Sequence, residues 1–544
     1  MLGALALCMS TACAPSRSGD IAATARRDLP KTRAERSNYL ETSRYADVIA
    51  FLDSLKLMAA PLAFGSIGRT SESREIPYVI AARPLVRTPA EARATGKPIV
   101  YVQGNIHAGE VEGKEALQAL IRDLTFASAP NVLDSIVLIA VPIYNADGNE
   151  RFLPQARQRT EQNGPELVGQ RPNTQGPNGQ GLDLNRDYVK AEAPETRASL
   201  GMFNTWDPDV FVDLHTTDGS FHGYALTYSP SLNPAAPLGD YTRVLLNELR
   251  KRVRSRDGFE IYDYGNFNDR GGLEVSTDTT HGGWYTYDHR PRFGTNYYGL
   301  RNRISILSEA FSHDAFERRV KSTYAFVRQL LSLVAERSAE MRSLERMAEA
   351  QMRSTPREEI PLRSALPAEA SSGPVAFEIL VRTGDTLRTQ PGVPKGMRRT
   401  GEIRTRNMPL FDRFVPVLSR PLPDAYVFGD DTALVARLRL HGIRVEHSTA
   451  ADANMRLSAF AIDSVSRSVR PFQGHNEVRP HGHWVSLSRT LTAGSNLVRT
   501  DQPLGRLASY LLDAETDDGF VTWNAFDSAL APQAAFPVQR ASLP

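Results

Sequence analysis

Four short apolar runs, each ending in polar residues, set the strongest limit on the fold of this chain. They cover residues 98–102, 136–143, 210–214 and 304–307. The first leads into a helical pattern whose apolar residues, Ala116, Leu117, Leu120, Ile121 and Leu124, share one face. A buried strand that passes directly into an amphipathic helix is typical of an α/β fold. In such folds ligands bind beyond the carboxyl ends of the strands.

Size and composition indicate a soluble protein of two domains. The chain has 544 residues, more than one ordinary hydrophobic core accommodates. Its hydrophobic content of 41% and charged content of 23% are those of a globular protein. The net charge of +2, from 64 basic and 62 acidic residues, gives no reason to expect a nucleic-acid partner.

The first thirteen residues contain both cysteines, Cys8 and Cys13, so the body of the chain has no disulfide framework and no cysteine-based metal site. Residues 2–9 are apolar but too few to span a bilayer. Residues 1–13 resemble the end of a bacterial lipoprotein signal, although a basic segment is missing and Ser10 replaces the usual Leu. We expect export to the periplasm or cell envelope, with an acyl anchor on Cys13. The alternatives are a soluble secreted protein and a disordered N-terminus.

The rest of the chain divides into segments that differ in composition and in hydrophobic pattern. Residues 14–37 are small and polar and predict a flexible tether, and residues 38–353 form the first domain, which ends in a long helix at 314–352. Residues 354–373, with prolines and mixed charge, predict a linker. Residues 374–544 alternate short strand-like runs with two helical patterns. They predict a smaller α/β or β-rich accessory domain, and they contain no motif that indicates chemistry.

Separate apolar strands deliver metal-binding side chains to one edge of the predicted sheet. His107 and Glu110 follow the first run, His215 follows the third, and Glu309 follows the fourth. Imidazole and carboxylate donors suit Zn²⁺, and three of them with a water make the open site of a zinc hydrolase. Glu309 is then the base that takes the proton of the water, and Asp183 is placed to hold an imidazole.

The order of these motifs is similar to that of the zinc carboxypeptidases of the carboxypeptidase A and B type. It runs His-x-x-Glu, Asp-x-Asn-Arg-Asp, Asp-Leu-His and a strand-end Glu, and the resemblance extends over residues 38–334. It implies a mixed central sheet flanked by helices, one zinc ion, and hydrolysis of C-terminal peptide bonds. By the same resemblance His107, Glu110 and His215 are the zinc ligands, and Glu309 is the catalytic carboxylate. Asn185 and Arg186 bind the terminal carboxylate of the substrate, and Arg159, with Arg157 next, stabilises the oxyanion.

The sequence departs from that pattern in several places. The interval from Arg186 to His215 is shorter than in the digestive enzymes, and the Gln-, Asn- and Gly-rich loop at 151–181 is unlike theirs. The mobile tyrosine of the family has four candidates, Tyr285, Tyr287, Tyr297 and Tyr298. On their own, residues 185–187 could be a turn with an ion pair, and Arg157 and Arg159 could be solvated surface.

The remaining histidines leave further alternatives open. His475, His481 and His483 with Glu477 could form a second metal site, or they could lie on a surface loop. Four others, His222, His281, His289 and His313, could line the cleft, but their spacing does not indicate it.

The function that these residues predict is a zinc exopeptidase acting on peptides with a free C-terminal carboxylate. One alternative is a zinc deacylase of N-acyl amino acids, of the aspartoacylase or succinylglutamate-desuccinylase type, which uses a similar His-x-x-Glu and a distant His. Another is a surface binding protein without catalysis or zinc. The sequence indicates neither the side chain that is preferred nor the oligomeric state.

Overall fold

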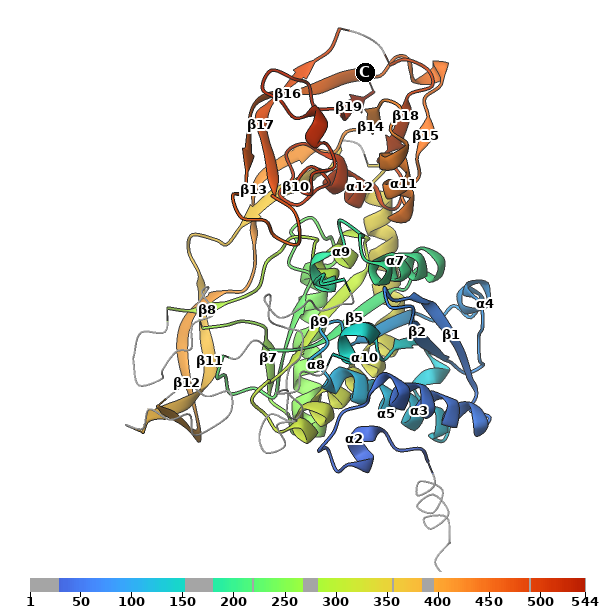
Figure 1. Cartoon of the computed structure of the whole chain (residues 1–544), viewed down its shortest axis with the longest axis vertical. Coiled ribbons are helices and arrows are strands. Elements are labelled where there is room, and N and C mark those ends of the chain that lie inside the picture. Colours follow the sequence, from blue (N-terminus) through green and yellow to red (C-terminus); the bar gives the residue numbers. More distant parts are fainter. Residues whose placement is uncertain are drawn as a thin grey trace, which may run out of the picture.

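A computed structural model describes residues 29–151, 180–217, 220–267, 282–354, 357–383, 396–488 and 491–543. Its centre is an eight-stranded mixed sheet in the order β1-β2-β4-β3-β5-β9-β6-β7 (Figure 1). The strands are β1 (Leu62–Arg69), β2 (Glu75–Ala81), β3 (Ile99–Gly104), β4 (Val137–Val141), β5 (Val210–Thr216), β6 (Leu226–Pro230), β7 (Ile261–Asp263) and β9 (Ile304–Ala310). The four central strands are parallel, and β2 and β6 join them antiparallel. The predicted α/β fold with a mixed central sheet is confirmed.

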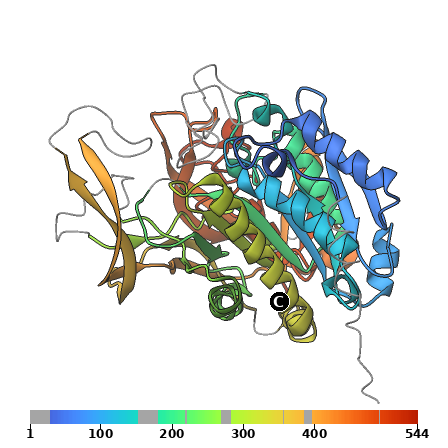
Figure 2. The ribbon, with the colours of Figure 1, turned by 90° about the horizontal axis from the view of Figure 1, so that it is seen from below.

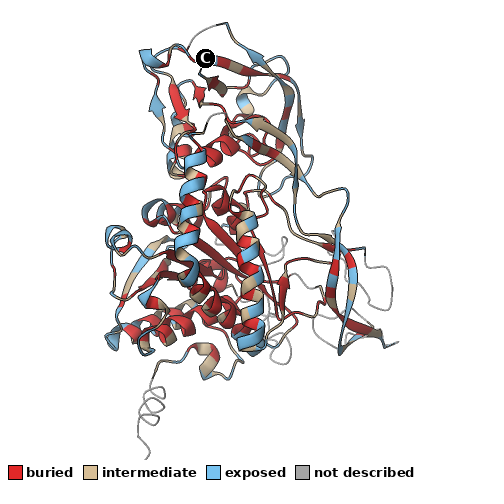
Figure 3. Cartoon of the chain, turned by 180° about the vertical axis from the view of Figure 1, so that it is seen from behind, coloured by how far each residue is buried: buried red, intermediate tan, exposed pale blue. Residues whose placement is uncertain are grey.

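The two faces of the sheet bury alternate residues of each strand. In β3, Val100 and Val102 belong to one hydrophobic cluster, whereas Ile99 and Tyr101 belong to another. Every residue of β3 is buried, and the middle of the molecule is drawn mainly in the red of buried residues in Figure 3. The sheet is therefore covered on both faces, which explains why its central strands read as continuous apolar runs.

Helices cover the first face. Residues of α3, α5, α8 and α10 pack there against the sheet (Figure 2). The exposed stripes of the helices are pale blue in Figure 3. The helices of residues 29–354 are α2 (Arg33–Arg36), α3 (Tyr45–Leu57), α4 (Pro89–Ala94), α5 (Glu112–Phe126), α6 (Ala146–Asn149), α7 (Pro194–Trp206), α8 (Gly239–Asp257), α9 (Gly294–Leu300) and α10 (Phe316–Gln351). The long helix predicted at 314–352 is α10, and it runs towards the C-terminal region (Figure 1).

The C-terminal region, residues 357–543, is rich in β-structure, as predicted. It contains a six-stranded sheet in the order β15-β18-β14-β19-β16-β17, a two-stranded sheet of β10 and β13, and the β11–β12 hairpin, which pairs with β8 (Trp284–Tyr285). Its strands are β10 (Glu359–Ala365), β11 (Ser371–Arg382), β12 (Met397–Phe411), β13 (Val415–Pro421), β14 (Ala425–Phe428), β15 (Glu446–His447), β16 (Arg456–Arg467), β17 (Val478–Ser486), β18 (Asn496–Arg499) and β19 (Gln539–Ser542). Its helices are α11 (Thr432–Leu440) and α12 (Gly505–Leu512).

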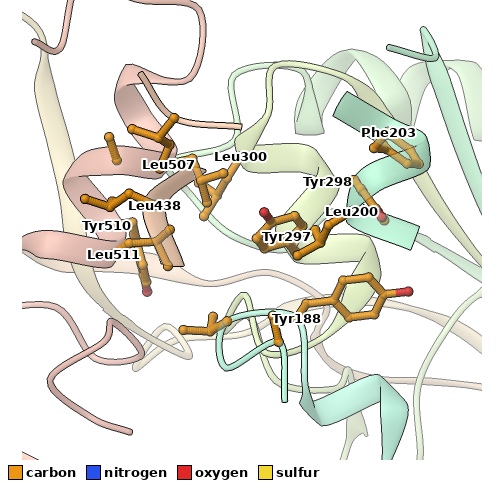
Figure 4. Close-up of a cluster of buried hydrophobic side chains, with 14 of the residues drawn as sticks. Tyr188, Leu200, Phe203, Tyr297, Tyr298, Leu300, Leu438, Leu507, Tyr510 and Leu511 are labelled. Carbon is orange, nitrogen blue, oxygen red and sulfur yellow. The ribbon is translucent and has the colours of Figure 1, made fainter. Parts of the chain in front are cut away.

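The C-terminal region shares a hydrophobic cluster with the second face of the central sheet. Figure 4 shows Tyr188, Tyr297 and Leu300 of the N-terminal part beside Leu507 and Tyr510 of α12. All five side chains are buried. The two parts of the chain therefore pack through a continuous apolar cluster.

Two segments differ from their expected form. Residues 33–36, which we expected within the flexible tether, form α2, because Thr32 caps this turn and Glu35 pairs with Arg122 of α5. The expected linker at 354–373 includes β10 and the start of β11, and it buries Ile360 and Leu362. Residues 1–28, with the expected lipoprotein-like signal and most of the tether, lie outside the described residues. Among the helices of the described ranges, none has the length and apolarity needed to cross a bilayer.

Candidate active site

Three side chains from separate parts of the sequence meet at the carboxyl end of the central sheet. His107 and Glu110 lie in the connection from β3 to α5, and His215 lies near the end of β5. The two carboxylate oxygens of Glu110 lie 2.8 Å from His107 Nδ1 and 2.9 Å from His215 Nδ1. One donor atom from each residue falls within 4.8 Å of the others, and this is the one such cluster among the described residues.

An aspartate lies against the outer nitrogen of each imidazole. His107 Nε2 is 3.2 Å from Asp183 Oδ1, and His215 Nε2 is 3.0 Å from Asp213 Oδ2. Carboxylates in these positions fix the tautomer and the ring orientation, so that both Nδ1 atoms face the shared glutamate. The sequence analysis anticipated Asp183 but missed Asp213. The signal was present, because residues two apart on a strand lie on the same face.

The electrostatics of the cluster suit a divalent cation. Burial lowers the pKa of His107, but the charges of Glu110 and Asp183 outweigh burial and raise it to about 10. Burial raises the pKa of Glu110, but the two imidazoles outweigh it and lower this pKa to about 2. The raised pKa of His107 means that the carboxylates around it stabilise positive charge at this site. Two imidazole nitrogens and a carboxylate at these positions fit zinc.

Glu309 lies beside this cluster on the adjacent strand. The β5–β9 register pairs it with His215, and it is 9% exposed. Tyr287 is the nearby tyrosine. Burial first, and then the charge of Glu309, raise the pKa of its buried hydroxyl.

The other three tyrosine candidates are occupied elsewhere. Tyr297 contacts His441 Nδ1 at 2.7 Å, Tyr298 contacts Ser199 at 2.7 Å, and the ring of Tyr285 stacks on another aromatic ring. Among the four candidates, Tyr287 is the one whose buried hydroxyl has a pKa raised in part by the charge of Glu309.

Asn185 and Arg186, which the sequence analysis predicts to bind a terminal carboxylate and which are here called the carboxylate-binding pair, lie in a short 3-10 turn, Leu184–Arg186, directly after Asp183. The Asp183 side chain accepts a hydrogen bond of 2.9 Å from Asn185 N. Gly294 N donates to Asn185 Oδ1 at 2.9 Å, and the Arg186 guanidinium lies 4.0 Å from the centre of the Phe293 ring. The Arg186 side chain is 26% exposed. The pair is therefore fixed next to the metal-binding cluster while its charged end can reach a ligand.

The turn with an ion pair, considered as an alternative for residues 185–187, is present in a different form. The close ion pair is Asp187 with Lys190, at 3.2 Å, whereas Arg186 lies 3.7 Å from Asp183. The turn and the carboxylate-binding role are thus compatible. Arg159 and its neighbour Arg157 lie outside the described residues.

The remaining histidines do not form a second metal-binding group among the described residues. His475 contacts Glu192 and Asn524, His481 contacts Ser466, and His483 lies near Asp463. Three of the histidines considered as cleft-lining have contacts of their own: His222 packs against Phe311, His313 packs against Phe221, and His289 contacts Asp517. His281 is not among the described residues.

Comparison with known proteins identifies a family that part of this chain matches. Residues 48–298 match the family described as zinc carboxypeptidase. The chain is 23% identical over 506 residues to carboxypeptidase 2 of Trichophyton tonsurans, over 87% of this chain and 81% of the relative. It is 22% identical over 493 residues to carboxypeptidase 2 of Trichophyton rubrum, over 84% and 78%. A metallo-carboxypeptidase structure from Burkholderia cenocepacia is similar over 55% of this chain and 71% of that chain, with 16% identity and a TM-score of 0.40.

Proposed function

We propose that the protein removes C-terminal residues from peptides with a free carboxylate, because residues 48–298 match the zinc carboxypeptidase family. The proposal assigns zinc to His107, Glu110 and His215, the base to Glu309, and substrate binding to the carboxylate-binding pair. One observation carries it. Asp183 contacts both His107 of the metal cluster and Asn185 of the pair, so that the reacting centre and a carboxylate site lie within one hydrogen-bonded unit.

The chemistry follows from the positions of the side chains. Zinc, when bound, lowers the pKa of a water and polarises a carbonyl oxygen. Glu309, in register with His215, would accept a proton from the attacking water and return it to the nitrogen of the departing residue. The charge of Glu309 contributes to the raised pKa of the Tyr287 hydroxyl. This hydroxyl can donate a hydrogen bond to the peptide.

The carboxylate-binding pair supports an exopeptidase rather than an endopeptidase. A planar guanidinium makes two parallel hydrogen bonds to a carboxylate, and an internal peptide bond offers no such partner. Because Arg186 stacks on Phe293, its fork is already oriented before substrate binds. A peptide held there by its terminus presents its last amide bond to the metal centre.

A side-by-side assay tests the proposal. The zinc-loaded protein is expected to hydrolyse a peptide with a free C-terminus, and to leave the amidated peptide and an N-acyl amino acid nearly unchanged. Preferential hydrolysis of the N-acyl amino acid would assign the deacylase instead. Hydrolysis of no member of the panel, with no bound zinc after metal reconstitution, would assign a binding protein.

We also propose that the chain is exported and held at the membrane by a lipid on Cys13. The support is the run of small residues before this cysteine. Cells grown with a labelled fatty acid are expected to transfer the label to the wild-type protein and not to C13S. Equal labelling of both, or of neither, would contradict the anchor.

A further inference from the structure

A turn of the C-terminal region reaches the segment that holds the metal centre and the carboxylate-binding pair. Asp183 N donates a 2.9 Å hydrogen bond to Gln473 Oε1, across a separation of 290 residues. Gln473 lies at the tip of a two-residue turn, closed by hydrogen bonds between Phe472 and His475. Its φ of 50° and the φ of 82° at Gly474 are those of a tight hairpin turn. The turn thus presents the Gln473 side chain in a defined direction.

The residues that follow Arg186 are held by the same region. His475 Nε2 lies 3.0 Å from Glu192, and the Lys190 ammonium lies 4.4 Å from the centre of the Trp523 ring. Lys190 in turn donates to the backbone oxygen of Arg186 at 2.7 Å. The segment that bears the pair is therefore supported from the C-terminal region at both ends.

A second support reaches the pair through residues 292–294. Asp518 accepts hydrogen bonds from Arg292, at 2.7 Å from its backbone N and 3.0 Å from its Nε. The next residue, Phe293, stacks on Arg186, and Gly294 N donates to Asn185. Residues 292–294 thus transmit the position of the C-terminal region to both members of the pair.

We propose that Gln473 is a positioning residue for substrate recognition, an inference that rests on the proposed exopeptidase function. Its oxygen fixes the peptide group of Asp183 and hence the turn that aims Asn185 and Arg186. The C-terminal region is then a structural part of the substrate site. Loss of the Gln473 acceptor lets this turn rotate, and it weakens binding of the terminal carboxylate more than it affects the chemical step.

Two substitutions of matched length separate the hydrogen bond from packing. Q473M keeps the length of the side chain and, like Gln, must adopt a positive φ at this position, but it lacks the oxygen acceptor. Q473E keeps an oxygen acceptor. Val469 is 95% exposed on the same loop, so V469A is the matched control. The measurement is kcat and KM for a peptide with a free C-terminus and the residual hydrolysis rate of its amidated form, with zinc content and Tm recorded for each variant.

For Q473M we expect KM for the free peptide to rise about 3- to 10-fold, the usual effect of losing one hydrogen bond, with kcat, zinc content and amidated-peptide hydrolysis little changed. Q473E and V469A should stay within about twofold of wild type. Equal losses on the free and amidated peptides, an unchanged KM in Q473M, or equal loss in Q473E would overturn the inference. If wild type itself shows no preference for the free carboxylate, the proposed function fails first, and this inference fails with it.

Discussion

Asp183 Oδ1 lies 3.2 Å from His107 Nε2, a contact between segments 76 residues apart. On the other imidazole, Asp213 makes the equivalent contact. Two histidines of one metal site are therefore each oriented by an aspartate. The pattern ties the strength of metal binding to side chains that do not touch the metal.

Removing either aspartate charge should weaken zinc binding. We expect D183N and D213N each to lower zinc affinity about 10- to 100-fold, because the imidazole loses the partner that sets its tautomer and direction. Competition with a fluorescent zinc chelator measures this. D463N, on an exposed aspartate near His483, is the control and should bind zinc as wild type does. Wild-type affinity in both D183N and D213N would show that the contacts do not orient the ligands.

Replacing the proposed base should separate metal binding from turnover. E309Q is expected to keep one zinc ion and to lose about 10²- to 10⁴-fold in kcat, since the amide cannot accept the proton of the water. E317Q, on an exposed glutamate of α10, should keep full activity. Zinc analysis and peptide hydrolysis on the same sample provide both measurements. An active E309Q would remove Glu309 from the mechanism.

Arg186 should matter for the end of the substrate rather than for its interior. R186A is expected to lower kcat/KM for a free-carboxylate peptide about 100-fold, the loss of a charge-assisted bidentate pair, with a much smaller effect on the amidated peptide. R186K should recover only part of the loss, because an ammonium lacks the planar fork. R197A, on an exposed arginine of α7, serves as control. Equal losses on both peptides would exclude the carboxylate role.

Stabilisation by zinc should increase with pH. In the metal-free protein the neighbouring carboxylates, acting against burial, raise the pKa of His107 from 6.5 to about 10. A raised pKa contributes stability that is complete below pH 6.5 and is lost as the pH rises towards 10. Zinc replaces the protons on the imidazoles, so the zinc-loaded protein does not undergo this loss. The difference in Tm between zinc-loaded and chelated protein should therefore widen from pH 6.5 to 10, and a constant difference would contradict the assignment.

Acid should destabilise the junction of the two parts of the chain through His441. Burial, with the charge of Arg301 second, lowers the pKa of His441 to about 3, while the unfolded chain titrates near 6.5. A lowered histidine pKa means that stability falls as the pH falls from 6.5 towards 3, by about 1.4 kcal/mol per pH unit. H441Q should remove this contribution to the slope of unfolding free energy against pH. H447Q, on an exposed histidine, should leave the slope as in wild type. An unchanged slope in H441Q would show that His441 is not the group.

The metal-binding cluster could be predicted from sequence because its signals are local. Each ligand follows an apolar run, and parallel strands bring their carboxyl ends to one edge of the sheet. The identity of His107, Glu110 and His215 thus followed from where the strands end. The long helix predicted at residues 314–352 was likewise found, as α10 (Phe316–Gln351).

The missed features depend on contacts between remote segments. The sequence in and around β10 is rich in charged residues and proline, and it does not predict a strand. β10 is a strand because it pairs with β13. α2 is a single turn, too short to show a helical period, and its contact with Arg122 is made across the fold. Gln473 has no local signature at all. Its relation to Asp183 depends on how the C-terminal region packs on the central sheet.

The contacts made by the C-terminal region fix the order in which the substrate site can be completed during synthesis. Gln473, Asp518 and Trp523 are made long after the metal ligands, and they support the turn that carries Asn185 and Arg186. A nascent chain that has emerged only as far as α10 has its zinc ligands but lacks these supports. We expect the carboxylate-binding pair to become fully ordered only when almost the whole polypeptide has emerged from the ribosome. A protein truncated after α10 would then have a metal site without a complete binding site for the C-terminus of the peptide.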